Sequence, residues 1–165
     1  EILLDMTGLQ TVERSDTISL AALTEEVFCD LDPIAEKHQI RLIQAEGDCT
    51  VTGSYILLYR AVYNLVENAI KYNRPSGSVT VSIHSAESAV LEVTDTGIGI
   101  SPENQEKIFD PFYRVDKSRS RAMGGAGLGL ALVSEIARQH NGQVKVTQSS
   151  EKGSTIALIL PVTIL

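Results

Sequence analysis

A row of polar side chains repeats at helical spacing between residues 60 and 71. Arg60, Asn64, Glu67, Asn68 and Lys71 fall on one face when the segment is drawn as a helix. Asparagine is a poor helix former, so two of them on one face need a reason. An amide oxygen beside a carboxylate, with a lysine one turn on, suits Mg²⁺ and phosphate. The alternative is the solvated face of an amphipathic helix, and this segment alone does not decide between the two.

Two glycine-bearing segments offer further chemistry. In Asp95-Thr96-Gly97-Ile98-Gly99 the carboxylate can accept a hydrogen bond from the amino group of a base, and the glycines let the backbone approach a ligand. The alternative is a simple turn, because Asp and Gly favour turns. Glycine-rich residues 124–130 precede a predicted helix, where backbone N–H groups and the helix dipole bind anions. A flexible hinge is the alternative for this second segment. Neither a P-loop lysine nor dinucleotide-binding glycine spacing is present.

Helices and strands that would position these residues follow from apolar periodicity. We predict helices from Leu20, capped by Ser19 and kinked or divided at Pro33, from Ser54 to about Asn73, and from Leu128 to His140. A short helix is expected within 102–109. The predicted strands are Arg41–Ile43, Thr50–Thr52, Ser78–His84, Ala89–Thr94, Gln143–Gln148 and Ser154–Leu160. The fold class is therefore α+β, a two-layer sandwich of a mixed, mostly antiparallel sheet and about three helices. The long charged connection within 101–125 is expected to act as a mobile lid.

Bulk composition limits the classes of function. The chain has 165 residues, which suits one domain, and its net charge of −7 disfavours nucleic acid or an anionic membrane as the main partner. Cys29 and Cys49 lack metal-ligand spacing and are expected to be reduced thiols. As reduced thiols they are typical of a cytoplasmic domain, which is expected here. No segment has the roughly 20 apolar residues of a membrane span.

Five segments together resemble a known family, the sensor histidine kinases of bacteria. Asn64–Tyr72 is similar to the N box of their ATP-binding catalytic domain, Asp95–Ile100 to the first glycine box, Ile108–Arg114 to the F box, Gly125–Leu130 to the second glycine box, and Gly153–Thr155 to their late Gly-Ser/Thr-Thr segment. The order of the segments matches as well. The wider superfamily includes DNA gyrase, heat-shock chaperone and mismatch-repair ATPases, but the Gly-Leu-Gly-Leu form of the second box favours the kinase branch. The resemblance implies a Bergerat-type ATP-binding fold.

The resemblance implies ATP and Mg²⁺ as ligands, and it assigns roles to residues. Asn68 would bind Mg²⁺, Lys71 the phosphates, Asp95 the adenine amino group and Arg114 the transferred phosphoryl group. Thr155 would close the base pocket from below. The nucleotide-binding set implied is Asn64, Asn68, Lys71, Tyr72, Asp95, Gly97, Gly99, Ile100, Arg114, Gly125, Gly127, Leu128, Gly129 and Thr155.

The catalytic set implied is Asn68, Lys71, Arg114 and Glu67, although Glu67 is either a proton acceptor or a plain surface carboxylate. Positioning and neutralisation of charge are what phosphoryl transfer requires of such residues. Two departures from the family pattern stand out. Gly53-Ser54 stands where the family usually has an aspartate before the N-box helix, which affects helix capping, and Ala126 replaces a frequent hydroxyl residue beside the phosphates.

No histidine here has the His-acid context of the family's phosphate acceptor. His38, His84 and His140 are therefore interpreted as ordinary surface or edge residues. We expect residues 1–15 to end an upstream dimerisation helix and linker, and 16–165 to form the catalytic domain. The expected partners are ATP or ADP, the histidine-bearing dimerisation domain and, through a membrane-anchored parent protein, a response regulator. The alternatives are a nucleotide-binding sensor module and an ATPase or serine kinase of the same superfamily.

Overall fold

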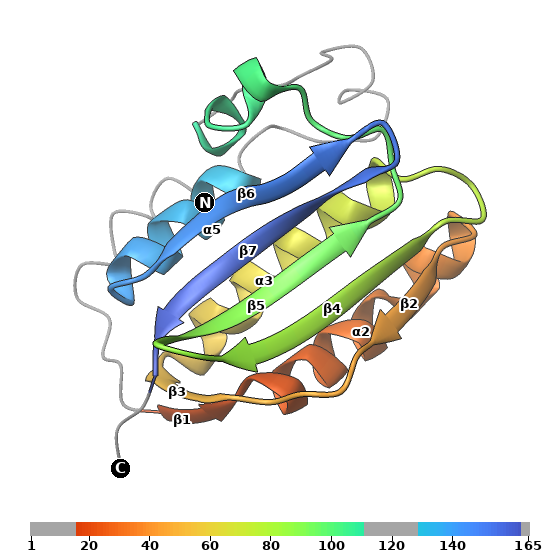
Figure 1. Ribbon diagram of the computed structural model, residues 1–165. Coiled ribbons are helices and arrows are strands. Elements are labelled where there is room, and N and C mark those ends of the chain that lie inside the picture. The colour runs from red at the N-terminus through yellow and green to blue at the C-terminus, as the bar shows by residue number, and fades with distance from the viewer. Residues whose placement is uncertain (1–15, 111–128, 163–165) are drawn as a thin grey trace.

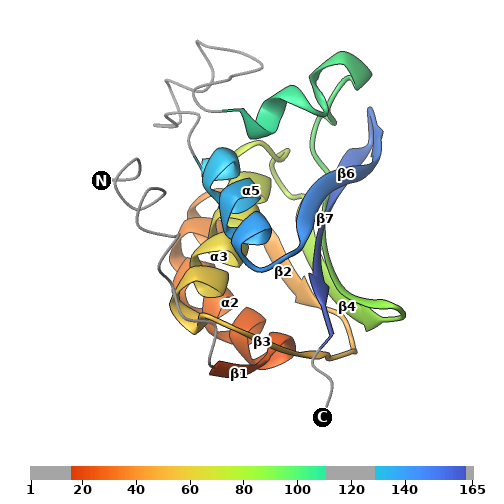
Figure 2. The same cartoon turned by 90° about the vertical axis from the view of Figure 1, so that its left-hand side faces the viewer.

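The protein forms two layers, a twisted sheet and a layer of helices against one of its faces (Figures 1 and 2). The computed structural model describes residues 16–110 and 129–162. The open face of the sheet is the one seen in Figure 1, with the helices behind it. This arrangement confirms the predicted α+β sandwich.

Five strands make up the main sheet, in the order β2-β4-β5-β7-β6. The bounds of these strands are β2 Arg41–Gln44, β4 Ser78–Ser85, β5 Ser88–Asp95, β6 Gln143–Ser150 and β7 Gly153–Pro161. Only β2 and β4 are parallel among these neighbours, and the other three pairs are antiparallel. Buried and half-exposed residues alternate along the first six residues of β4 and of β5, because one face packs on the helices and the other meets solvent.

A second, two-stranded sheet pairs β1 (Asp16–Ser19) with β3 (Thr50–Gly53). The sequence predicted β3 but not β1, because four residues show too little alternation to stand out. The predicted short helix within 102–109 is also wrong in detail. Two separate 3₁₀ turns form there instead, η2 (Pro102–Asn104) and η3 (Lys107–Phe109).

Three α-helices cover the sheet in the described part of the chain: α2 (Leu20–Lys37), α3 (Tyr55–Lys71) and α5 (Gly129–Gln139). As predicted, Ser19 and Ser54 cap α2 and α3, each with its hydroxyl oxygen accepting a backbone N–H one turn on. Of the two outcomes predicted at Pro33, division of the first helix is wrong, since α2 continues through it to Lys37, and a kink stays a prediction. The proline is exposed, and the buried residues on the other face of α2 hold the helix together by packing.

The hydrophobic core lies between the layers. Leu58, Leu65, Leu91 and Leu158 are almost fully buried there. Helix α3 packs against β4 and β5, and α5 packs against β6 and β7. Among residues 16–110 and 129–162, no helix combines the length and apolarity needed to cross a bilayer.

Candidate nucleotide-binding site

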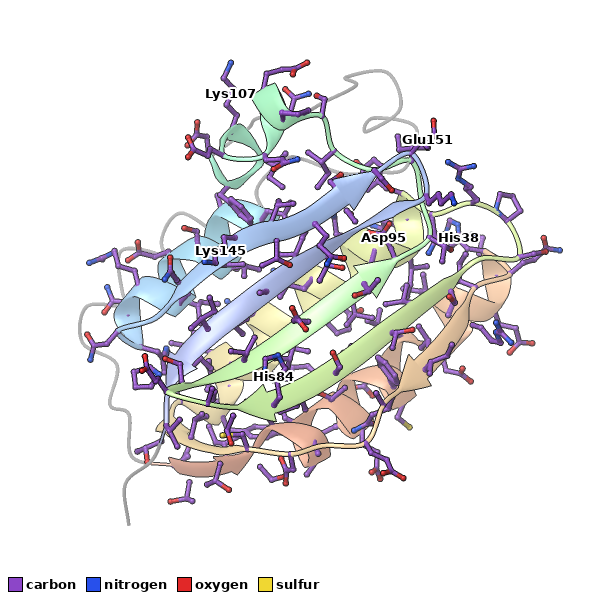
Figure 3. The ribbon with its side chains drawn as sticks, viewed as in Figure 1. His38, His84, Asp95, Lys107, Lys145 and Glu151 are labelled. Atoms are coloured by element: carbon purple, nitrogen blue, oxygen red, sulfur yellow. The ribbon has the colours of Figure 1, made fainter. Side chains whose placement is uncertain are left out.

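Asp95 lies at the end of β5, beside the first residues of β7 (Figure 3). The C-terminal end of α3 comes to the same edge, because the Cβ of an alanine in place of Gly97 would lie 2.5 Å from the Tyr72 carbonyl oxygen. Three segments that are far apart in sequence, from α3, β5 and β7, therefore meet around one carboxylate.

The Asp95 carboxylate is half-buried and accepts three hydrogen bonds. Oδ1 accepts from the backbone N–H of Gly97 at 2.8 Å and of Ser154 at 3.3 Å, and Oδ2 accepts from the Ser154 hydroxyl at 2.9 Å. Burial raises the pKa of Asp95 above its ordinary value, and these hydrogen bonds oppose that rise. The bonds fix the orientation of the carboxylate, and Oδ2, with one donor in place, can accept a second from a ligand.

Ser154, rather than the neighbouring Thr155, makes the contact with Asp95. Side chains alternate along a strand, and Ser154 is paired with Asp95 while Thr155 is paired with Thr94 on the other face. The Thr155 hydroxyl is 2.9 Å from that of Thr94. The role implied for Thr155 stays a prediction. Sequence reasoning missed Ser154, although its place in the same late segment was a usable signal.

Gly97 and Gly99 fit their implied role of shaping the backbone at this edge. Gly97 is buried against the end of α3. Gly99 has a φ of +81°, and an added Cβ would lie 2.0 Å from the carbonyl oxygen of Ser150. A residue with a side chain fits neither the conformation nor the space at Gly99. Half-buried Ile100 follows, and its N–H donates to the Ser149 hydroxyl at 2.6 Å.

The polar face of α3 is not a fully solvated face. Each of its five members is half-buried, in contrast to Ile56 on the same helix, which is 71% exposed. Near the middle of α3, the side-chain amide of Asn64 donates to the carbonyl oxygen of Gly129 at 3.5 Å, which brings this face to the first turn of α5. Lys71 lies 3.7 Å from Glu67. The structure thus brings the N-box helix and the start of α5 together.

The side-chain amide of Asn68 has no hydrogen-bond partner among the described residues, so its oxygen is available to a ligand. The same residues contain no group of three or more His, Cys, Asp or Glu side chains that would form a metal cage. Mg²⁺ is usually held by one or two protein oxygens together with substrate phosphates, and an amide oxygen on α3 beside the start of α5 fits that arrangement.

Buried Asn73 and exposed Thr96 form a second connection that sequence reasoning missed. The Asn73 amide donates to the Ser78 carbonyl at 2.8 Å, and its oxygen accepts from the Thr96 hydroxyl at 2.8 Å. Thr96 in turn accepts from the Ser78 N–H at 2.9 Å. This network ties the end of α3 to β4 and to the segment after β5, so it holds Asp95 and α3 in fixed relation.

Four residues of the predicted nucleotide-binding set lie outside the described residues: Arg114, Gly125, Gly127 and Leu128. So does the greater part of the predicted lid, from residue 111 onward. The interpretation of the histidines needs one correction, because His140 is only 4% exposed and is no surface residue. His84 is exposed on the open face of the sheet, where its Nε2 lies 3.4 Å from Glu92, and His38 is half-buried after the end of α2.

The model of one protein family, described as histidine kinase-, DNA gyrase B- and HSP90-like ATPases, matches residues 53–164. That range contains α3, the whole main sheet except β2, and every residue of the site. The chain belongs to this ATPase family. Within the family it is an ATP-binding catalytic domain of the bacterial sensor histidine kinase type, as its relatives show.

Relatives of the ATPase domain include several sensor kinases. Sensor-like histidine kinase SenX3 of Mycobacterium bovis is 39% identical over 165 residues, covering 96% of this chain and 40% of SenX3. Sensor histidine kinase RppB of Synechocystis is 43% identical over 141 residues, covering 85% of this chain and 31% of RppB. The solved structure of the mycobacterial sensor histidine kinase MprB superposes with a TM-score of 0.75 at 28% identity, over 92% of this chain and 99% of that one. The chain thus spans less than half the length of these two curated relatives.

Proposed function

We propose that this domain binds Mg²⁺-ATP and donates the γ-phosphoryl group to a histidine on an upstream helical domain of its parent protein. The observation that carries the proposal is that α3 takes part in two groups of residues, which we call the base half-site, around Asp95, and the phosphate half-site, around Asn68 and Lys71. Asp95, held by Gly97 and Ser154, presents a carboxylate oxygen to a base. The half-buried face of α3 carries Asn68 and Lys71 on the turns that follow Asn64, which contacts Gly129 in the first turn of α5.

Each half-site suits one part of the nucleotide. A carboxylate accepts hydrogen bonds and therefore selects the amino group of adenine over the carbonyl of guanine. The other half-site offers an amide oxygen to Mg²⁺, an ammonium group to the phosphates and the N-terminal end of α5 to negative charge. We assign Lys71 to the phosphates, with Glu67 setting its orientation through their 3.7 Å contact.

Several assignments rest on the sequence pattern alone. We propose Arg114 for the charge that develops on the departing phosphoryl group, and Gly125, Gly127 and Leu128 for the phosphate chain. We also propose that residues 1–15 belong to the linker from the helical domain, that the parent protein is anchored in the membrane with this domain in the cytoplasm, and that a response regulator accepts the phosphoryl group afterwards.

Transfer of radiolabel from ATP tests the proposal. The chain is incubated with γ-labelled ATP and Mg²⁺, with and without the upstream helical domain of its parent. We expect acid-labile, base-stable label on the helical domain only. Arg114→Ala should reduce the label far more than it reduces ATP binding, because its charge matters most as the bond breaks. Absence of label on the helical domain, with ATP still bound, would favour the nucleotide-sensor function, and label on serine would favour a serine kinase.

A further inference from the structure

The N-terminus of α3 is capped by groups from three separate segments. The Ser54 hydroxyl accepts the N–H of Leu57 at 3.3 Å, and Asp16 of β1 accepts the N–H of Tyr55 at 3.0 Å. The N–H of Ser54 itself donates to Nε2 of His140 at 3.0 Å. In the common capping box a Glu or Gln at the third helical position accepts that last N–H. Leu57 occupies the position here, so a histidine from the end of α5 supplies the missing acceptor.

Two contacts fix the tautomer of His140. Nδ1 lies 2.8 Å from the carbonyl oxygen of Ile136, which can only accept, so Nδ1 carries the proton. Nε2 faces the N–H of Ser54, which can only donate, so Nε2 carries none. The imidazole is therefore neutral, and both of its nitrogen atoms are bonded, in a side chain that is 4% exposed.

The backbone is shaped to receive this ring. A Cβ added to Gly53 would lie 2.5 Å from Cδ2 and 2.7 Å from Nε2 of His140. After the ring, Asn141 takes a positive φ of 60° and the N–H of Gly142 donates to the Ala137 carbonyl at 2.8 Å, which ends α5 abruptly. The imidazole thus occupies a place that Gly53 leaves open.

The two helices joined by His140 are the two that carry the phosphate half-site. At the opposite end of α5, Gly129 receives the hydrogen bond of Asn64. The helix between these ends has 11 residues, about 16 Å at the α-helical rise. Buried apolar side chains pack α3 against α5. A hydrogen bond is directional and fixes the register along the helix axis.

We infer that His140 is a positioning residue, whose neutral imidazole locks α5 against the cap of α3 and so aligns the start of α5 with Asn64 and Asn68 for phosphate binding. This inference rests on the proposed function. The residues proposed to bind adenine around Asp95 lie on the sheet and at the end of α3, so the loss of the imidazole leaves adenine binding largely intact. The effect is therefore specific to the phosphates.

Calorimetry with Mg²⁺-ADP and with adenosine tests the inference in the whole chain. We expect His140→Leu to weaken ADP binding about tenfold, the size of one hydrogen bond, and adenosine binding less than about twofold. His140→Gln, whose Oε1 can accept the Ser54 N–H, should restore ADP binding to within about threefold. Gly53→Ala, which displaces the ring but keeps the histidine, should resemble His140→Leu. The control Val133→Ala removes buried volume from α5 without touching the imidazole, and it should bind both ligands normally.

A spectroscopic readout needs no substitution. Long-range ¹H–¹⁵N spectra of the unaltered chain should show His140 with its proton on Nδ1, and a proton on Nε2 would overturn the inference. Equal losses for ADP and adenosine, normal ADP binding in His140→Leu, or failure of the Gln variant would overturn it too. If the unaltered chain binds ADP no better than adenosine, the proposed function fails together with the inference. If the unaltered chain binds ADP more tightly than adenosine and His140→Leu does so equally well, only the inference fails.

Discussion

Replacing Asp95 with asparagine should weaken nucleotide binding and stabilise the fold at the same time. The amide keeps the size of the carboxylate, and its oxygen can still accept the N–H groups of Gly97 and Ser154. Its NH₂ group takes the place of Oδ2 and donates to the Ser154 hydroxyl, which can accept as well as donate. The adenine amino group then meets a donor in place of a charged acceptor. The lost charge-assisted bond corresponds to about 2 kcal/mol, or roughly thirtyfold in Kd.

The gain in stability follows from the pKa of Asp95. Burial raises it, so the folded protein holds the proton more tightly than the unfolded chain does, and ionisation at neutral pH costs folding free energy. The favourable contribution of Asp95 is complete below its unfolded pKa and is lost as the pH rises through its folded pKa. Asp95→Asn should therefore unfold at a higher urea concentration than the unaltered chain at pH 7, and this difference should shrink as the pH falls toward the ordinary pKa of an aspartate, about 4.

Calorimetry and urea unfolding together check this pair of effects, with Asp32→Asn, an exposed carboxylate on α2, as the matched control. ATP, ADP and adenosine should lose affinity by the same factor in Asp95→Asn, because all three carry adenine. Unchanged affinity would remove the basis for placing the base at Asp95. A loss of both affinity and stability at pH 7 would show instead that the carboxylate holds the fold together.

Three further predictions concern other parts of the domain. Asn68→Ala should weaken ATP binding in Mg²⁺ and leave binding in EDTA nearly unchanged, and equal losses in the two titrations would exclude Asn68 as a metal ligand. Gly99→Ala should lower the free energy of unfolding, measured in urea, by at least about 2 kcal/mol, because φ at Gly99 is +81° and the new Cβ would lie 2.0 Å from the Ser150 carbonyl oxygen. A change below about 0.5 kcal/mol would contradict that geometry. The chain alone should acquire no stable label from γ-labelled ATP, since His140 is buried with both nitrogen atoms bonded and His84 lies on the open sheet face; stable label would reveal an unrecognised acceptor.

Local signals in the sequence were sufficient for most of the fold. Ser19 and Ser54 could be identified as caps because capping needs only a hydroxyl three residues before its partner. The alternation in β4 and β5 and the apolar face of α3 likewise reflect short-range periodicity. Because these signals place the end of β5 well, Asp95 can be recognised as a candidate site residue from the amino-acid sequence.

The features that were missed depend on contacts between distant segments. His140 is buried because its acceptor nitrogen meets Ser54, 86 residues away in sequence, and no local pattern carries that information. The strand β1 exists only through its pairing with β3. Adjacent residues of a strand point to opposite faces of the sheet. The sequence alone does not say whether Ser154 or Thr155 of β7 lies on the same face as Asp95 of β5, because that depends on how the two strands pair. Pro33 does not divide α2, because packing by the buried face of the helix outweighs the loss of one helical hydrogen bond.

Titration of the ¹⁵N-labelled chain with Mg²⁺-ADP tests most directly whether the nucleotide binds between α3, β5 and β7. The backbone amides of Asn68, Gly97, Gly129 and Ser154 should shift together, because they belong to the two half-sites. His84 and Lys145, which lie on the open face of the sheet (Figure 3), should keep their positions at saturation. Shifts centred on the open face, with Gly97 and Ser154 unmoved, would contradict the account of the site.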